Sequence, residues 1–209
     1  MPCHLNKSHK YRLTYFDAPG RAELIRWTFA FAGQEFEDVR IQGSDWPSLK
    51  GTTPHGTLPI LDVDGKIIPE SITIARYVAR QTNLTGKDNF ETALADAVVD
   101  YVNDAARAFS ALDSEKDEKK KIGLQEDFVK TKLQAYLKVL EHYLQLNPHG
   151  DGFIVGSKPT WADFAVTIFL RNPAFDSSLL DNYKLLKAHQ ERVLGLKPIK
   201  EWIQKHTKN

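Results

Sequence analysis

A change in hydrophobic pattern near Gly86 constrains the fold of this chain more than any other feature of its 209 residues. Before Gly86, short β-type runs alternate with helical patterns, and Gly and Pro separate them. After it, apolar residues recur at helical spacing almost to the end of the chain. The pattern predicts an α/β domain of residues 10–86 and an all-helical domain of residues 87–209, preceded by a polar tail of residues 1–9.

The first domain is predicted to hold a small mixed sheet in a βαβ-ββα order. Strands are expected at residues 11–16, 36–41, 57–62 and 66–68, with one helix ending at Gly33 and another opening near Ser71. The first strand–helix–strand unit favours a parallel pair with a right-handed crossover. The Asp64-Gly65 turn makes the last two strands antiparallel.

The second domain is predicted to be an antiparallel helical bundle, because two long amphipathic stripes follow Asn89. Thr160 is expected to cap a third helix, with Asp163 at the position where a capping box usually has Glu or Gln. Pro198 fits the first turn of a last helix. The stripes consist of Phe90, Leu94, Ala97, Val98, Tyr101 and Val102, and of Leu133, Tyr136, Leu137, Leu140, Tyr143 and Leu144.

Composition excludes several classes of protein. The net charge of +1 gives no reason to expect a nucleic-acid or anionic-membrane partner, and no apolar run approaches the length of a membrane-spanning helix. One cysteine, Cys3, rules out an internal disulfide framework, and the polar N-terminus has no signal-type apolar core. Seven scattered histidines lack the spacing of a structural zinc site. We therefore expect a cytoplasmic protein without a metal.

Two features point to a peptide-like ligand that has an amino-acid head group. Pro59 interrupts a predicted strand, which is tolerated at a sheet edge or with a cis bond, where Leu58 could pair with an extended peptide. Glu70 and Ser71 open a helix, and a helix N-terminus attracts a carboxylate while Glu70 suits an ammonium. Each feature alone has an ordinary structural explanation, an edge-strand proline and a serine cap.

Two further features offer hydrogen-bond donors. Trp46 and Lys50 present an indole N–H and an ammonium, which suit a carboxylate, and Tyr15 ends the first strand at the edge where open sheets place ligands. Separately, each is best explained by packing or solvation.

Together, in this order, these residues resemble the glutathione-binding domain of cytosolic glutathione S-transferases. The similarity is greatest to the sigma class, which includes prostaglandin D synthases, and within it to the nematode branch. The motifs that carry it are Leu13-Thr14-Tyr15-Phe16, Gly20-Arg21-Ala22-Glu23-Leu24-Ile25-Arg26, Asp45-Trp46-Pro47, Gly56-Thr57-Leu58-Pro59-Ile60-Leu61, Glu70-Ser71, Ile74-Ala75-Arg76-Tyr77 and Thr160-Trp161-Ala162-Asp163-Phe164.

The resemblance implies a thioredoxin-like first domain that binds glutathione, γ-Glu-Cys-Gly, as co-substrate. Glu70 and Ser71 would hold the γ-Glu head group, and the backbone of Leu58, before cis-Pro59, would pair with the cysteinyl unit. The glycine carboxylate would lie in a groove lined by Trp46, Lys50, Gly56 and Thr57.

The resemblance also implies the catalytic groups and the assembly. The Tyr15 hydroxyl would hydrogen-bond the sulfur, with the Arg21 guanidinium nearby. Asp104 would reach the γ-Glu ammonium from the partner subunit of a homodimer. The electrophile would lie against Phe16, Tyr101 and Phe109, although ordinary packing explains these rings equally well. The implied reaction is conjugation of glutathione to hydrophobic electrophiles, a detoxification.

The chain departs from the family pattern in several places. Glu70 stands where Gln is common, and His55 stands where several members have an aromatic residue that packs into the partner subunit. Asp100, Asn103 and Asp104 match an acidic cluster of the prostaglandin synthase with one acid missing, and Ala111 replaces a pocket tryptophan. These changes weaken the alternative of a glutathione-dependent prostaglandin isomerase. A non-enzymatic carrier of haem or hydrophobic ligands is the second alternative.

Overall fold

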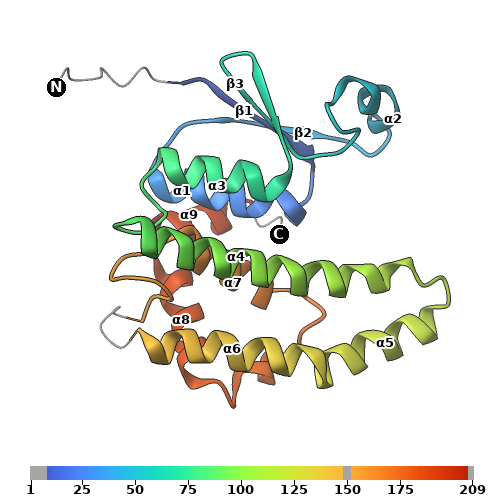
Figure 1. Cartoon of the computed structure of the whole chain (residues 1–209). Helices are drawn as coiled ribbons and strands as arrows, with labels where there is room; N and C mark the ends of the chain where they lie inside the picture. Colours follow the sequence, from blue (N-terminus) through green and yellow to red (C-terminus); the bar gives the residue numbers. More distant parts are fainter. Residues whose placement is uncertain (1–8, 148–151, 207–209) are drawn as a thin grey trace. The chain divides into compact units, whose positions relative to one another are not determined.

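The computed structural model describes residues 9–147 and 152–206. The chain divides into two compact units, Met1–Val78 and Ala79–Asn209. The first is built around a sheet and the second from helices, which is the predicted combination (Figure 1). Residues 1–8, which include Cys3 and most of the predicted tail, lie outside the described residues.

The first unit contains a four-stranded sheet in the order β2-β1-β3-β4. Strand β1 pairs in parallel with β2 and antiparallel with β3, and β3 pairs antiparallel with β4, as predicted for a thioredoxin-like fold. The strands are β1 (Tyr11–Phe16), β2 (Glu37–Ile41), β3 (Ile60–Val63) and β4 (Lys66–Pro69).

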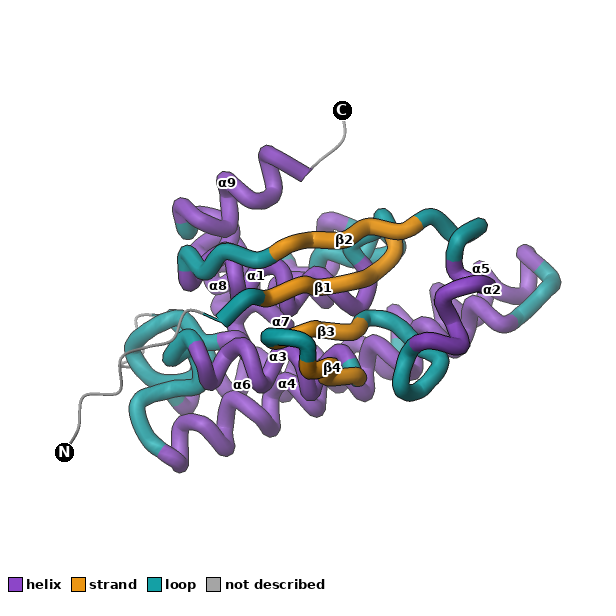
Figure 2. Tube along the Cα trace, turned by 90° about the horizontal axis from the view of Figure 1, so that it is seen from above, coloured by secondary structure: helices purple, strands orange, loops and turns teal. Residues whose placement is uncertain are grey.

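Two helices cover one face of this sheet, as Figures 1 and 2 show from two directions. They are α1 (Glu23–Ala32) and α3 (Ser71–Gln81). Gly33 ends α1 in the left-handed conformation, with φ of 65°, which confirms the predicted helix end. Leu13, Ile25 and Leu61 are fully buried, so the core of the unit lies between the sheet and these helices.

Two sequence predictions in this unit were wrong by a few residues. Strand β3 begins at Ile60 rather than at residue 57, because Pro59 has no N–H to donate to a ladder. Ser71 is the first helical residue of α3 rather than its cap. The Glu70 carbonyl accepts from the Ile74 N–H at 2.9 Å, so Glu70 occupies the capping position.

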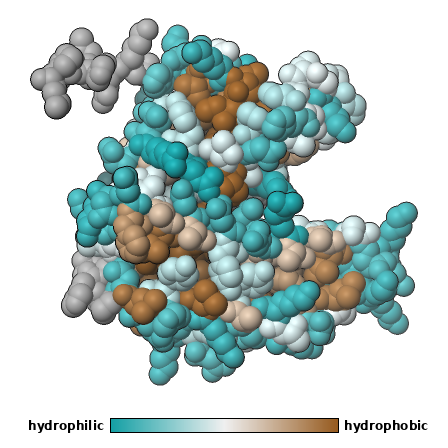
Figure 3. All heavy atoms as spheres, viewed as in Figure 1, coloured by the Kyte–Doolittle hydropathy of each residue, from teal (hydrophilic) through white to brown (hydrophobic). Residues whose placement is uncertain are grey.

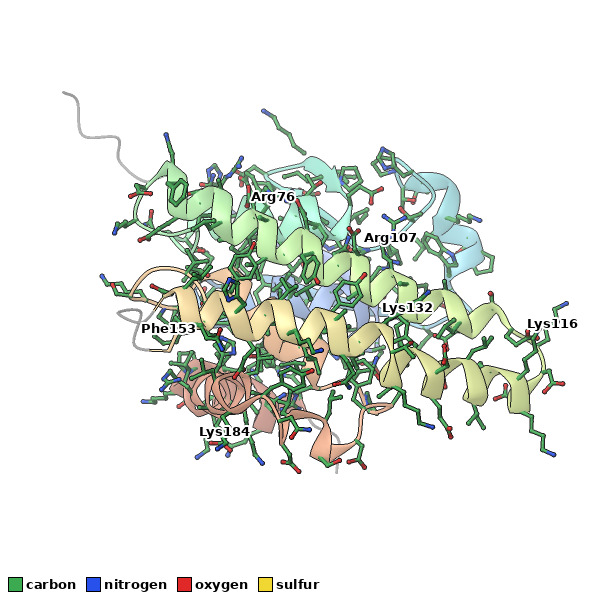
Figure 4. The ribbon with its side chains drawn as sticks, turned by 60° about the horizontal axis from the view of Figure 1, so that its bottom comes forward. Arg76, Arg107, Lys116, Lys132, Phe153 and Lys184 are labelled. Carbon is green, nitrogen blue, oxygen red and sulfur yellow. The ribbon has the colours of Figure 1, made fainter. Side chains whose placement is uncertain are left out.

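The second unit consists of helices, with long connections before and after the helix Trp161–Leu170. Its α-helices are α4 (Asn89–Ser110), α5 (Glu118–Lys130), α6 (Lys132–Leu146), α7 (Trp161–Leu170), α8 (Lys184–Gly195) and α9 (Lys197–His206), with short 3₁₀ turns η3 (Ala111–Ser114) and η4 (Ser177–Leu180). Figure 4 shows their side chains, with Lys116 in the connection between α4 and α5 and Lys132 at the start of α6.

Both predicted stripes form helices, but the stripe on α4 is only partly buried. Val98 and Val102 are in the core, whereas Phe90, in the first turn, is 72% exposed. On α6, Leu133, Leu137 and Leu140 are fully buried. Among the described residues, no helix has the length and apolar character that crossing a bilayer requires.

The predicted capping box at the start of α7 is present. The Asp163 carboxylate accepts from the backbone N–H of Thr160 at 2.7 Å and from that of Ile154 at 2.8 Å. It also lies 2.9 Å from Nε2 of His189 on α8, and both side chains are fully buried. One carboxylate therefore joins the start of α7, the preceding loop and α8.

Candidate active site

The strand register gathers the predicted site residues of the first unit at one end of the sheet. Thr14 and Ile60 form the last residue pair between β1 and β3. Ile60 also pairs with Pro69 of β4. Tyr15, Pro59 and Glu70 each come one residue beyond these pairs, so they lie together where the β1–β3 and β3–β4 pairings end. The Leu58–Pro59 peptide bond is cis, as the resemblance implies.

The Tyr15 hydroxyl is held by the turn that follows β1. The backbone N–H of Arg21, in η1 (Gly20–Ala22), donates to Tyr15 Oη over 3.3 Å. Gly20 adopts φ of 43°, and a Cβ at that position would lie 2.7 Å from Tyr15 Oη. Only glycine allows this approach. Because the N–H occupies one lone pair of the oxygen, the O–H remains available to donate to a ligand.

Aromatic rings extend the site from Tyr15 to the segment after β2. The ring of Phe16 lies 5.5 Å from that of Tyr15 and 5.9 Å from that of Trp46, centroid to centroid, edge to face. Trp46 begins α2 (Trp46–Leu49), which places its indole beside the end of β1. The structure thus brings Tyr15, Phe16 and Trp46 into one continuous group.

Lys50 lies against the Gly56 backbone. It begins the 3₁₀ turn η2 (Lys50–Thr52), and a Cβ on Gly56 would meet Lys50 Cε at 3.6 Å. Within the described part of the chain, no carboxylate pairs with the Lys50 ammonium. Thr57 is exposed and follows Gly56 directly, so this stretch presents a cation and backbone groups to solvent.

The start of α3 offers donors, and one neighbouring acid is already engaged. Ser71 is 7% exposed, and as the first helical residue its N–H has no partner within the helix. Glu70 has φ of 71°, and its Oε1 lies 3.0 Å from Nδ1 of His55. His55 and Glu70 are two of the positions where the sequence departs from the family pattern, and here they contact each other.

Three predicted site residues belong to the helical unit. Asp104 is exposed on α4, and Tyr101 on the same helix packs against Tyr136, with ring centroids 4.8 Å apart. Burial raises the pKa of Tyr101, and the neighbouring tyrosines add to the effect. Phe109 is 5% exposed and contacts Phe128, which places it in the core of its own unit. The role of these three residues at a ligand site remains a prediction.

The sequence predictions missed a chain of charges behind the site. Arg26 of α1 is fully buried and binds Asp38 of β2, which also binds Arg40, and Arg40 reaches Asp17. The signal was the alternation Asp38-Val39-Arg40, which puts opposite charges on one face of a strand. Among the described residues, no group of three or more His, Cys, Asp or Glu could hold a metal ion.

Comparisons with known proteins agree with the fold. The family model of the glutathione S-transferase N-terminal domain matches residues 11–80, and that of the C-terminal domain matches residues 103–206. The chain therefore belongs to the glutathione S-transferase family.

Two curated relatives and one solved structure cover nearly the whole chain. Hematopoietic prostaglandin D synthase of Gallus gallus is 42% identical over 95% of this chain and 97% of its own length. Probable glutathione S-transferase 9 of Caenorhabditis elegans is 35% identical over 93% and 96%. The crystal structure of monomeric Na-GST-3, a glutathione S-transferase of the hookworm Necator americanus, matches with a TM-score of 0.84 and 32% identity over 96% and 98%. The relatives thus include both nematode transferases and a prostaglandin synthase, as the sequence motifs imply.

Proposed function

We propose that this protein is a glutathione transferase that uses the Tyr15 hydroxyl to stabilise the thiolate of bound glutathione for attack on hydrophobic electrophiles. The observation that carries the proposal is the geometry at Tyr15. Its oxygen accepts the Arg21 N–H at 3.3 Å, which leaves its own proton to donate at the end of the sheet where the peptide-pairing segment Leu58–Pro59 also lies.

The remaining groups of the first unit match the two ends of glutathione. The Trp46 indole N–H and the Lys50 ammonium hold the glycine carboxylate, with Gly56 and Thr57 lining that part of the groove. The N–H and hydroxyl of Ser71 bind the α-carboxylate of the γ-Glu head group at the start of α3, a helix of eleven residues.

Glu70 accepts a hydrogen bond from the γ-Glu ammonium. In this role the ammonium displaces the His55 imidazole from the Glu70 carboxylate. The side chains of His55 and Glu70 are both more than half exposed, so the contact between them is worth about 0–1 kcal/mol and is easily displaced. The ammonium of glutathione then replaces the imidazole.

Activation of the thiol sets the catalytic demand on Tyr15. A free thiol has a pKa near 8.5 and is only a few per cent ionised at neutral pH. Lowering that pKa by ~2 units requires about 2.7 kcal/mol of preferential thiolate stabilisation. One charge-assisted O–H···S⁻ hydrogen bond, with the Arg21 guanidinium nearby, is of this size. The predicted electrophile contacts are Phe16 of the first unit and Tyr101 and Phe109 of the helical unit.

We propose further that the chain forms a cytoplasmic homodimer in which Asp104 of one subunit binds the γ-Glu ammonium held by the other. We propose that the two domains of each subunit are residues 10–86 and 87–209. The exposed position of Asp104 on α4 supports this assignment. The choice between monomer and dimer needs a direct test, because the hookworm neighbour is described as monomeric. Sedimentation equilibrium distinguishes the two states.

A second candidate function is glutathione-dependent isomerisation of a prostaglandin endoperoxide. It is favoured by the 42% identity to the Gallus gallus prostaglandin D synthase. The same thiolate would serve both reactions, so a product assay with the endoperoxide separates the two functions.

Steady-state conjugation of glutathione to a chloronitroaromatic electrophile tests the primary proposal. We expect turnover in the wild type and a large loss in Tyr15→Phe. No turnover in either protein, with glutathione still bound, would contradict it and favour a specialised isomerase or a carrier.

A further inference from the structure

The first unit contains a fully buried cation that the proposed mechanism does not use. Arg26 on α1 is 0% exposed. Its Nε donates to Asp38 Oδ1 at 3.0 Å, and its Nη1 donates to the carbonyl of Ala18 at 2.7 Å. Ala18 lies in the loop between Tyr15 and Arg21. A buried ion pair adds little net stability compared with apolar residues of the same size, so this arginine needs another explanation.

Arg26 belongs to a chain of alternating charges, and its Nη1 also lies 3.4 Å from Oε2 of Glu23 on its own helix. Asp38 uses its second oxygen to accept from Arg40 Nε at 2.9 Å, and Arg40 Nη1 donates to Asp17 at 3.1 Å. Burial opposes the charge on Arg40, but hydrogen bonds to Asp17 and Asp38 outweigh it, so the pKa of Arg40 is raised. We call these four side chains the loop clamp: Arg26, Asp38, Arg40 and Asp17.

The loop clamp holds the first residues of the turn that carries the catalytic hydrogen bond. Arg40 holds the turn at Asp17, its first residue, and Arg26 holds the carbonyl of Ala18. Two residues after Ala18, Gly20 lies against the Tyr15 hydroxyl, and the N–H of the following Arg21 donates to it. The guanidinium carbon of Arg26 also lies 5.9 Å from the centre of the Tyr15 ring, within range of a cation–π contact.

We propose that the loop clamp is a positioning device that fixes the Arg21 N–H on the Tyr15 oxygen and thereby sets how well Tyr15 donates to the glutathione sulfur. A hydroxyl that accepts a hydrogen bond is polarised and becomes a better donor. Small displacements of a catalytic group have large kinetic effects. This inference rests on the proposed transferase function and adds the groups that tune it.

The loop clamp should affect chemistry more than binding. The groups proposed to hold the ends of glutathione, Trp46, Lys50 and Ser71, lie on other segments of the unit. A loosened turn should therefore raise the pKa of the bound thiol and lower kcat, with little change in the KM for glutathione. A merely structural role would instead reduce the folded fraction and leave the thiol pKa of the folded protein unchanged.

The test uses the outer part of the clamp, because Arg26→Met removes the fully buried partner of Asp38 and lowers the yield of folded protein. Asp17→Asn and Arg40→Gln remove single charges from side chains that are about one quarter exposed. Arg12→Gln is the matched control, since Arg12 and Glu37 also form an ion pair between β1 and β2, at 3.4 Å, but at the other end of the strands. For each variant, thermal unfolding, kcat, KM and a titration of thiolate ultraviolet absorbance in the glutathione complex are measured.

We expect Asp17→Asn and Arg40→Gln to lower kcat about 3- to 10-fold and to raise the thiol pKa by up to about one unit, where one unit is a tenfold change in ionisation. The kcat and thiol pKa of Arg40→Lys should lie between those of these variants and those of the wild type. Both values for Arg12→Gln should match the wild type. Clamp variants whose kcat and thiol pKa equal those of Arg12→Gln overturn the inference while the transferase function stands. A wild type that neither ionises bound glutathione nor conjugates it overturns both.

Discussion

The two units of the molecule bury charge for different purposes. In the α/β unit, buried Arg26 holds a loop beside the candidate active site. In the helical unit, buried Asp163 fixes the start of α7 and meets His189 of α8. Substitutions of the first group should therefore change catalysis, and substitutions of the second should change stability.

The surfaces of the two units differ as well. Six of the seven large hydrophobic side chains exposed among the described residues belong to the helical unit, and only Ile67 belongs to the first. Figure 3 shows separate hydrophobic areas on a mostly hydrophilic helical surface. The six are Phe90, Ile122, Leu124, Val139, Leu146 and Leu185. Most of the exposed large hydrophobic side chains among the described residues thus belong to the helical unit.

The largest expected effect is on the stability of the helical unit. Asp163→Ala leaves the N–H groups of Thr160 and Ile154 and the ring of His189 without their shared acceptor. We expect the free energy of unfolding to fall by about 3–5 kcal/mol, because three groups lose their shared acceptor and each buried polar group left unsatisfied costs about 1–3 kcal/mol. Urea unfolding measures it. The control is Asp176→Ala, because Asp176 is an exposed residue that caps η4 by accepting from the Ser178 N–H. Equal losses of unfolding free energy in the two variants would refute the special role of Asp163.

The next effect separates catalysis from stability inside the α/β unit. Gly20→Ala puts a Cβ within 2.7 Å of Tyr15 Oη, whereas Gly33→Ala, at a similar positive φ, meets nothing within 4 Å. Both changes should cost about 1 kcal/mol or more of stability, because alanine disfavours positive φ. Only Gly20→Ala should also lower kcat, about 10-fold. The assays are urea unfolding and steady-state conjugation, and equal kcat values for the two variants would exclude a role for this close approach.

A smaller effect is expected on glutathione affinity. His55→Ala removes the imidazole that lies 3.0 Å from Glu70, so the carboxylate is free for the γ-Glu ammonium. We expect the KM for glutathione to fall about 2- to 3-fold, because an exposed contact worth up to about 1 kcal/mol no longer competes for the Glu70 carboxylate. The matched control is His9→Ala, which breaks an exposed contact with Asp64 in the same unit. A KM that rises in His55→Ala would show that the imidazole assists binding.

The smallest effect concerns an ion pair on the surface of the helical unit. The Lys120 ammonium and the backbone N–H groups of Asp117 and Lys116 lower the pKa of the Glu115 carboxyl. A carboxyl with a lowered pKa stabilises the fold above its ordinary pKa, and this contribution is lost as the pH falls through the lowered value. Glu115→Gln should slightly lower the urea midpoint at neutral pH and leave it unchanged in strong acid. A difference that grows in acid would contradict this account.

The features that local sequence governs were predicted well. Helix periodicity, Gly33 as a helix end and the Thr160–Asp163 capping box all follow from short-range physics, and the structure contains each of them. The same holds for the parallel and antiparallel strand pairs, which follow from connection lengths.

The features that depend on tertiary contacts were not predicted. The His55–Glu70 contact joins residues that are fifteen positions apart, through the register of β3 and β4. The loop clamp requires a side chain of α1 to reach β2, which no local spacing reveals. The cap of α3 was assigned to Ser71 because serine favours that position, whereas Glu70 takes it with a positive φ. The candidate site thus contains most of what the sequence alone did not predict.

The most direct test of the central claim is the ionisation of glutathione in its complex with this protein, for the wild type beside Tyr15→Phe. The thiolate is followed by its ultraviolet absorbance as the pH is raised. If Tyr15 stabilises the thiolate, the thiol of the wild-type complex titrates ~2 units below that of free glutathione, and Tyr15→Phe returns it close to the free value near 8.5. Equal titration midpoints in the two complexes would contradict thiol activation by Tyr15.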